Sequence, residues 1–205
     1  MSPLPNPIES PAECGYGRVS IREVRGKDAA ILRRLLTENR EWLQPWEATF
    51  PGGGGATPGS QPFRPVVRSM HRQRRSGNGV TFVMLLDGQV VGQLSVSDIS
   101  AGALRSASIG YWISRHVAGQ GVTPAAVALA IDYAFAELRL HRIEICIRPE
   151  NSASLRVVQK LGLRYEGRRE RYIHIDGKWC DHESFAVTVE EVKRGMLERL
   201  GAPTT

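Results

Sequence analysis

The stretch of the chain that most constrains its fold is residues 110–132, where a strand pattern runs through a glycine-broken loop into a helix pattern. Thr123 is placed to cap that helix, and Pro124 suits its first position because proline has a fixed φ and no N–H donor. A helix that begins directly after a tight turn aims several free N–H groups and the positive end of its dipole at one place. Such a junction favours a bound phosphate, although an ordinary strand–turn–helix corner shows the same local pattern.

The loop contains Gly119 and Gly121, which permit positive φ and a close approach of the backbone to a ligand. Its spacing matches neither the Walker pattern nor GxGxxG. A second loop–helix junction follows about thirty residues later, where Asn151 is placed to cap the next helix and Gly162 to end it. The second junction strengthens the case for a phosphate site over a plain corner.

Apolar alternation and helical spacing predict the element order βααβββαβαββα. The expected strands are residues 18–24, 80–86, 89–97, 105–113, 142–148, 165–175 and 178–187. The expected helices are residues 28–42, 63–76, 123–138, 151–161 and a last helix opened by a capping box of Thr188 and Glu191. Asp87-Gly88 and Asp176-Gly177 are two-residue hairpin signals. The crossover between residues 105–113 and 142–148 implies a parallel pair in an otherwise antiparallel sheet, with a cleft where that pair opens.

A chain of 205 residues is long enough for one well-buried α/β domain. We expect residues 1–17 to form a flexible tail, residues 18–205 a single domain, and the glycine-rich loop 51–65 to be mobile. The first residues lack the basic and apolar regions of a signal peptide, and the longest apolar run is too short to span a bilayer. Three widely spaced cysteines indicate neither a metal site nor a disulfide framework. We therefore expect a cytoplasmic protein without membrane contact or metal.

The formal net charge of +6 indicates an anionic partner. Part of that charge is concentrated in one predicted helix, in Arg64, Arg68, His71, Arg72, Arg74 and Arg75. A solvated helix face is one interpretation; a polyanionic cofactor or an acidic surface near the ribosome is the other. Only Phe63 stands near these cations, whereas nucleic-acid modules usually interleave aromatic residues with charge, so we expect no specific nucleic-acid partner.

Five segments in this order resemble the GCN5-related N-acetyltransferases (GNAT), from about Arg18 to the end of the chain. The segments are GYWI (110–113), HVAGQG (116–121), RPENSAS (148–154), KLGLRYEG (160–167) and DGKWCDH (176–182). More narrowly they resemble the RimJ/RimL group, which acetylates N-terminal amines of ribosomal proteins. The resemblance implies an α/β (α+β) fold, in which a splayed parallel strand pair in a mixed sheet forms the acetyl-CoA cleft and helices cover both faces.

The resemblance also implies site residues for acetyl-CoA. The strand containing Tyr111, Trp112 and Ile113 would run alongside the pantetheine. The pyrophosphate would be held by the amides of Ala118, Gly119, Gln120, Gly121 and Val122. Asn151 would bond the pantetheine arm, and Ser154 would protonate the leaving thiolate. From the residues alone, Asn151 is equally a plain N-cap and Ser154 a first-turn helical serine. Arg115, Arg156 and Lys160 are further candidates for the phosphates or ordinary surface charges.

One position departs from the family pattern. Related sequences often carry a glutamate, a candidate base, where this chain has Ser108, which cannot serve. The remaining candidates to accept the proton are Glu47, Asp98, Asp181 and His182. We assign catalytic roles to Ser154, Glu47 and Asp181, and substrate contacts to Trp46, Glu47, Asp181 and His182. Asp181 and His182 are otherwise a hydrogen-bonded pair at a strand end.

The function that these patterns favour is direct transfer of an acetyl group from acetyl-CoA to an amine, with no metal. A protein α-amine is the expected acceptor, and the resemblance implies that the protein is a ribosomal one. The pKa of an α-amine is about 7.7–8.0 and that of lysine about 10.4, so at cytoplasmic pH an appreciable fraction of the α-amine is neutral, whereas lysine is almost fully charged. Acetylation of a small amine, such as an antibiotic or a polyamine, is the second hypothesis. A non-catalytic CoA-binding or ribosome-associated module is the third, and monomer or homodimer stays open.

Overall fold

The structure, a computed structural model, describes residues 14–52, 59–60 and 62–201. Eight strands form one mixed sheet in the order β1-β2-β3-β4-β5-β6-β8-β7. Their bounds are β1 Cys14–Tyr16, β2 Val19–Glu23, β3 Gly79–Leu86, β4 Gln89–Ser100, β5 Ser106–Ile113, β6 Arg142–Ile147, β7 Arg164–Ile175 and β8 Lys178–Thr188. The helices are α1 Ala29–Glu38, α2 Arg40–Leu43, α3 Arg64–Arg75, α4 Val122–Ala136 and α5 Ser152–Lys160, with short 3-10 turns at η1 Gly26–Asp28, η2 Gln44–Trp46, η3 Arg115–Val117, η4 Val189–Val192 and η5 Leu197–Leu200.

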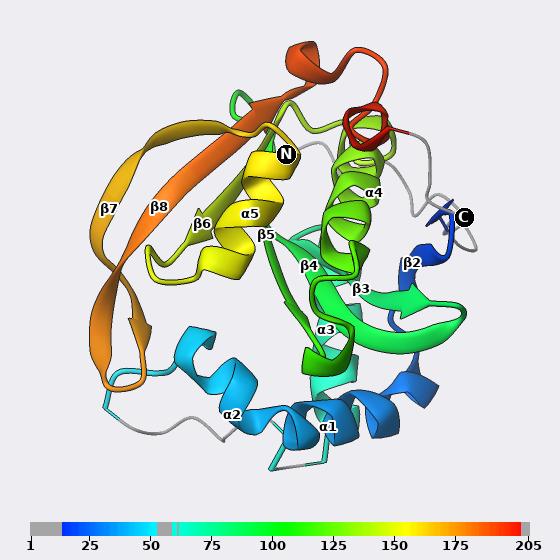
Figure 1. Ribbon diagram of the computed structural model, residues 1–205, viewed down its shortest axis with the longest axis vertical. Helices are drawn as coiled ribbons and strands as arrows, with labels where there is room; N and C mark the ends of the chain where they lie inside the picture. Colours follow the sequence, from blue (N-terminus) through cyan, green and yellow to red (C-terminus); the bar gives the residue numbers. More distant parts are fainter. Residues whose placement is uncertain (1–13, 53–58, 61, 202–205) are drawn as a thin grey trace.

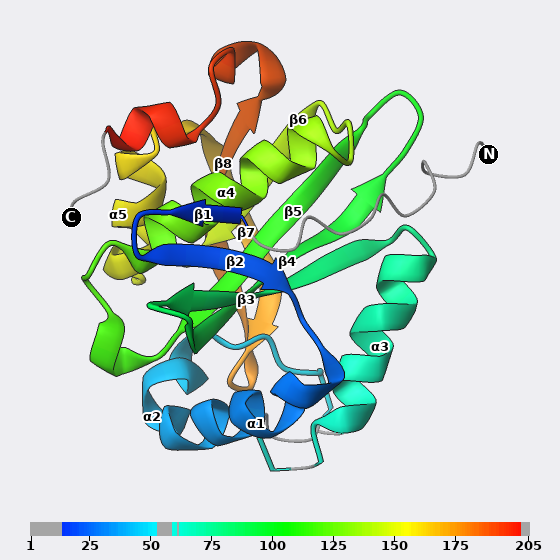
Figure 2. The same cartoon turned by 90° about the vertical axis from the view of Figure 1, so that its right-hand side faces the viewer.

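Helices cover both faces of the sheet, as Figures 1 and 2 show from two sides. On one face, α4 packs against β2–β6 and buries side chains around its whole circumference, because nearly every residue from Val122 to Ala134 is apolar or small. On the other face, α1, α2 and α3 enclose a smaller apolar cluster that includes Leu32, Leu43, Val67 and Val83. The predicted fold class is confirmed.

The parallel strand pair is short, and it opens as predicted. β5 and β6 are in register at Ser106 with Arg142, Ala107 with Ile143 and Ser108 with Glu144. Beyond that point β5 continues alongside β4, while β6 stays with β8, and the two strands diverge (Figure 1). A gap in the backbone hydrogen bonding of the sheet therefore begins directly after Ser108.

Both predicted hairpins are confirmed at their turns. Asp87 and Gly88 join β3 to β4 with φ values of 49° and 75°. Asp176 and Gly177 join β7 to β8 with φ values of 47° and 83°. Positive φ at two consecutive residues is the geometry of a type I′ turn, which Asp-Gly supplies at low cost.

The predicted helix 28–42 is broken in the structure, because Asn39 interrupts it with φ −107° and ψ 20°. The buried Asn39 side chain donates to the Leu35 carbonyl at 2.8 Å and accepts the Arg115 N–H at 2.9 Å. Asp28 does precede α1, but its carboxylate accepts the Arg25 N–H and pairs with Arg22 instead of capping the helix. The Arg115 contact comes from a distant segment, so helical periodicity gives no sign of it, and the Asp28 carboxylate is occupied by Arg22 and Arg25, which precede the helix.

Three further predictions need correction. The N-cap of α4 is Gly121, with φ 80°, so Thr123 and Pro124 stand at the second and third helical positions. The capping box of Thr188 and Glu191 is present, but it opens a single 3-10 turn, and a second turn follows after Gly195 in place of a continuous helix. The expected tail ends earlier than residue 17, because β1 pairs with β2; residues 1–13 and, within the loop 51–65, residues 53–58 and 61 lie outside the described residues.

Candidate active site

A cavity of about 650 Å³ lies where β5 and β6 separate. Its walls come from the end of β5, the glycine loop, the first turns of α4 and α5, β4, and the α2–η2 segment. Because α4 and α5 lie on one face of the sheet and α2 on the other, the cavity passes through the sheet at the opened pair. The lining residues are Trp42, Leu43, Trp46, Glu47, Gln93, Ser95, Gly110, Tyr111, Trp112, Ile113, Val117, Ala118, Gly119, Gly121, Val122, Thr123, Pro124, Glu150, Asn151, Ser152, Ala153, Ser154, Arg156, Val157 and Lys160.

The glycine loop presents unpaired backbone donors to this cavity. Gly119 and Gly121 have φ values of 83° and 80°, and a Cβ built on either would meet no atom within 4 Å. Val122 and Thr123 occupy the first two helical positions of α4, so their N–H groups have no intrahelical acceptor. Donors, dipole and open space together suit a phosphate group. The Gln120 side chain does not line the cavity; its Nε2 donates to the His116 carbonyl at 3.1 Å and closes the loop.

The free edge of β5 aims backbone groups into the gap. Ser114 donates its N–H to the Val91 carbonyl at 2.9 Å, on the β4 side. Because backbone groups alternate along a strand, those of Ile113 and Tyr111 face the other way, where β6 has turned aside. The Ile113 carbonyl accepts the Trp42 indole N–H at 3.0 Å from that side. The N–H groups of Tyr111 and Ile113 remain for a ligand that lies beside β5.

Two hydroxyl groups meet at the first turn of α5. The Asn151 side chain caps the helix as predicted, accepting the Ser154 N–H through Oδ1 at 3.0 Å, so its Nδ2 is the group left to bind a ligand. The Tyr111 hydroxyl lies by Ser154 without reaching full hydrogen-bonding geometry to any described residue, and it is buried. Burial raises the pKa of Tyr111 to about 12, and Ser154 opposes the rise.

The opposite wall, on the α2 face, carries charge and aromatic surface. Glu47 forms an ion pair with Arg40 in which both side chains are about four-fifths buried (exposed fractions 20% and 24%). Arg148, just after β6, donates to the Pro45 carbonyl at 2.8 Å, and its guanidinium carbon lies 5.6 Å from the centre of the Trp46 ring. Trp42 ties the same segment to β5, so α2–η2 is anchored to both strands of the opened pair.

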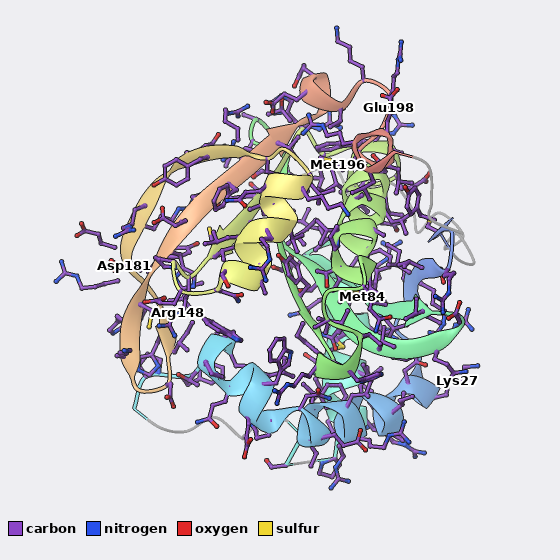
Figure 3. All side chains as sticks on the ribbon, in the orientation of Figure 1. Lys27, Met84, Arg148, Asp181, Met196 and Glu198 are labelled. Carbon is purple, nitrogen blue, oxygen red and sulfur yellow. The ribbon has the colours of Figure 1, made fainter. Side chains whose placement is uncertain are left out.

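Not all predicted site residues are brought together. Trp46 and Glu47 line the cavity, whereas Asp181 and His182 are outside its described lining. The Asp181 carboxylate accepts the Arg171 N–H at 2.8 Å, at an irregularity of β7 where Arg171 has φ 48°. His182 is buried, its Nδ1 bonds the Cys180 carbonyl at 3.1 Å, and burial lowers its pKa. Figure 3 shows Asp181 on the β7–β8 hairpin and Arg148 between that hairpin and α2.

The remaining base candidate, Asp98, is also outside the described lining of the cavity, as is Ser108. Ser108 stands at the last residue pair of the parallel strands, beside Glu144. The Glu144 carboxylate is held by Arg142 and Arg169 at 3.1 and 2.6 Å. Asp98 accepts the Ser97 hydroxyl at 3.2 Å. Among the described carboxylates, Glu47 and Glu150 are the ones that line the cavity.

Sequence reasoning missed several lining groups. Gln93 stands in an otherwise apolar stretch of β4, and its Oε1 is buried without a partner among the described residues. A polar residue between buried apolar neighbours was the available signal. Tyr111 was predicted to lie at the site through its strand, but its sequence position gave no sign that its hydroxyl would lie beside Ser154, which belongs to a distant segment.

Within the described ranges, no three His, Cys, Asp or Glu side chains gather as a metal site would require. Over the same part of the chain, every helix falls short of the length and apolar character needed to cross a bilayer.

The comparison with protein families decides the class of this site. A model described as an acetyltransferase (GNAT) domain matches residues 18–164. The chain belongs to the GNAT family. It is an acyltransferase with acetyl-CoA as its cosubstrate, and the resemblance read from its motifs is confirmed.

Relatives and solved structures agree with this membership. The Mycobacterium smegmatis RimJ in complex with CoA-disulfide superposes with a TM-score of 0.84 at 38% identity, covering 90% of this chain and 88% of that one. The Escherichia coli (strain K12) ribosomal protein uS5-alanine N-acetyltransferase is 29% identical over 182 residues, 85% of this chain and 89% of the relative. The probable N-acetyltransferase YjcK of Bacillus subtilis (strain 168) is 42% identical over 101 residues, and the match spans 49% of this chain and 56% of YjcK.

The cavity of this GNAT enzyme fits its cosubstrate. Pantetheine is an extended chain with amide groups, and the free edge of β5 supplies N–H donors along it. The buried Tyr111 hydroxyl and Gln93 Oε1 line the cavity without a fully formed hydrogen bond to any described residue. Arg156 and Lys160 line the cavity from α5 and add positive charge beside the glycine loop. The residues present therefore suit an anionic, amide-bearing ligand.

Proposed function

We propose that this acetyltransferase acts on the N-terminal α-amine of a protein, of the ribosomal-protein class that its relatives' names indicate. The observation that carries the proposal is the passage of the cavity through the sheet. Acetyl-CoA would occupy the α4–α5 side, where the glycine loop and Asn151 lie, and the acceptor would enter on the α2 side, beside Trp46 and Glu47. A chain end can reach into such a passage, because only its first residue has to enter.

The acceptor end suits a positively charged amine. The Glu47 carboxylate is held in place by Arg40 and faces a partly buried site, where its charge attracts an ammonium group more strongly than it would in water. The rings of Trp42 and Trp46 line the same end and provide apolar walls. An α-amine has a pKa of about 7.7–8.0, so an appreciable neutral fraction is available near pH 7 for attack.

Four groups of the chain would share the transfer. Backbone N–H groups of β5 near Ile113 bond the thioester carbonyl oxygen and stabilise the negative charge that develops there. The amine nitrogen forms a bond to the acetyl carbon as the carbon–sulfur bond breaks. Glu47, directly or through water, accepts the proton that the nitrogen loses. Ser154 delivers a proton to the departing sulfur and regains one from water, and the Tyr111 hydroxyl lies beside that serine.

A competition between peptides tests the acceptor. One peptide begins with a free alanine; a second has the same sequence with a blocked N-terminus and one lysine; a polyamine is the third acceptor. We expect acetylation of the free N-terminus to dominate, measured by mass spectrometry after incubation with labelled acetyl-CoA. Preference for the lysine peptide, or turnover of the polyamine alone, would refute the N-terminal proposal while leaving acetyl-CoA-dependent transfer intact.

A further inference from the structure

Helix α3 carries a row of arginines that the acetyl-transfer site does not use. Arg64, Arg68, Arg72 and Arg75 recur at intervals of four, four and three residues, so they lie on one face of the helix. All four are exposed. At 1.5 Å per residue the row is about 16 Å long. We call these four residues the arginine stripe.

The flank of α3 next to the stripe fixes the helix to the domain. Val67 is buried in the cluster on this face of the sheet. His71 bonds the Val24 carbonyl through Nε2 at 2.9 Å. Arg74 pairs with Glu23 at 2.9 Å. The stripe is therefore displayed on an anchored helix and not on a loose segment.

The stripe has no counter-charge within the described part of the chain. Arg74, one residue away from it in sequence, has Glu23 as partner, yet none of the four stripe arginines bonds or pairs with a described side chain. The first turn of α3 has no acidic residue, although acids are favourable there. Successive stripe residues are like-charged neighbours on the helix, which is itself unfavourable. An anion laid along the helix would relieve both effects.

We propose that the arginine stripe binds the phosphate backbone of an RNA duplex. A straight row of guanidinium groups on a rigid helix matches a regular row of phosphates, which arginine binds through two N–H groups. Within the stripe there is no aromatic side chain on which unpaired bases would stack, which favours a duplex over a single strand. Contacts to phosphate carry no sequence information, so the recognition is independent of base sequence.

The choice of RNA rests on the proposed function, because a ribosomal-protein acceptor is presented beside RNA. The stripe and the cavity are separate, since no residue of α3 is among the described residues that line the cavity. Figure 2 shows α3 along one side of the molecule, away from α5 and the glycine loop. Binding at the stripe would hold the enzyme near its acceptor without blocking the site.

Fluorescence anisotropy with a labelled 20-base-pair RNA duplex tests the proposal, across a range of salt concentrations. The stripe variant replaces Arg64, Arg68, Arg72 and Arg75 with glutamine. The control variant replaces four exposed cations elsewhere, Arg139, Arg171, Lys178 and Lys193, so that both variants lose the same charge. A DNA duplex of the same sequence and a poly-glutamate peptide are the comparison ligands. Thermal unfolding and acetylation of the alanine peptide check the fold and the active site independently of RNA.

We expect the stripe variant to bind the RNA duplex at least tenfold more weakly than the unaltered protein. The slope of log Kd against log salt concentration should be smaller by about three in the stripe variant. The control should change less than threefold, and both variants should retain peptide acetylation. Equal losses in the two variants, or wild-type binding by the stripe variant, would overturn the proposal, as would absence of RNA binding by the unaltered protein. Tighter binding of DNA would overturn the assignment to RNA, and tighter binding of poly-glutamate would point to an acidic protein instead.

Discussion

Replacing Gly121 with valine tests the phosphate site directly. Gly121 has φ 80°, and a Cβ there meets no protein atom within 4 Å, so the new Cβ has room in the domain itself. Its cost to the fold comes from holding a branched residue at positive φ, about 1–3 kcal/mol. In a protein of this size that lowers Tm by roughly 2–4 °C per kcal/mol.

The effect on acetyl-CoA binding has a different origin. The valine methyl groups would occupy the open space in front of the first N–H groups of α4, where the pyrophosphate is expected. Loss of one hydrogen bond to a charged oxygen costs about 1.5–3 kcal/mol, which is roughly 10- to 150-fold in Kd. Isothermal titration calorimetry with acetyl-CoA measures this change.

Gly102 offers a matched control for backbone strain. It has φ 72° in an exposed turn between β4 and β5, and a Cβ there also meets nothing within 4 Å. Gly102→Val should therefore lower Tm to a similar extent while leaving the Kd for acetyl-CoA within about twofold. If Gly121→Val binds acetyl-CoA as tightly as Gly102→Val does, the pyrophosphate site lies elsewhere and the reasoning from the glycine loop is wrong.

Four more predictions concern catalysis and stability. Ser154→Ala should lower kcat about 10²-fold with little change in the Kd for acetyl-CoA, because a proton donor to sulfur acts in the transition state. If kcat decreases by less than about twofold, water and not Ser154 protonates the thiolate. Tyr111→Phe should lower kcat by a smaller factor than Ser154→Ala does. If the hydroxyl acts through Ser154, the Tyr111→Phe substitution should have no further effect on kcat in the Ser154→Ala variant. Because the pKa of Tyr111 is about 12, its ionisation should not change the dependence of the rate on pH below pH 10. Glu47→Gln should lower kcat/KM for the alanine peptide and shift its dependence on pH, whereas an unchanged profile would remove Glu47 as proton acceptor. The hydrogen bond from Arg142 lowers the pKa of Glu166 from 4.5 to about 2. This stabilisation is present above pH 4.5 and lost as pH falls towards 2, so the Tm difference between wild type and Glu166→Gln should shrink over that range; a constant difference would contradict it.

Local sequence determined much of the fold, because the forces that set those elements are local. The two Asp-Gly turns need positive φ at consecutive residues, and their neighbours alternate in polarity, so both hairpins were predictable. Asn151 caps α5 through an atom three residues away. The crossover through α4 required a parallel pair, and with it the cleft. Gly119 and Gly121 marked the end of that cleft at which we expect an anion to bind.

The α2 side of the cavity is held by contacts that only the tertiary structure revealed. Trp42 and Arg148 tie the α2–η2 segment to β5 and to the end of β6 through bonds that span 71 and 103 residues. Asn39 breaks the first helix because its side chain is needed at the glycine loop. Helical spacing reports which residues share a face, but it carries no information about what that face meets. For the same reason Asp181 and His182, which belong to a segment that resembles the family, lie outside the described lining of the cavity.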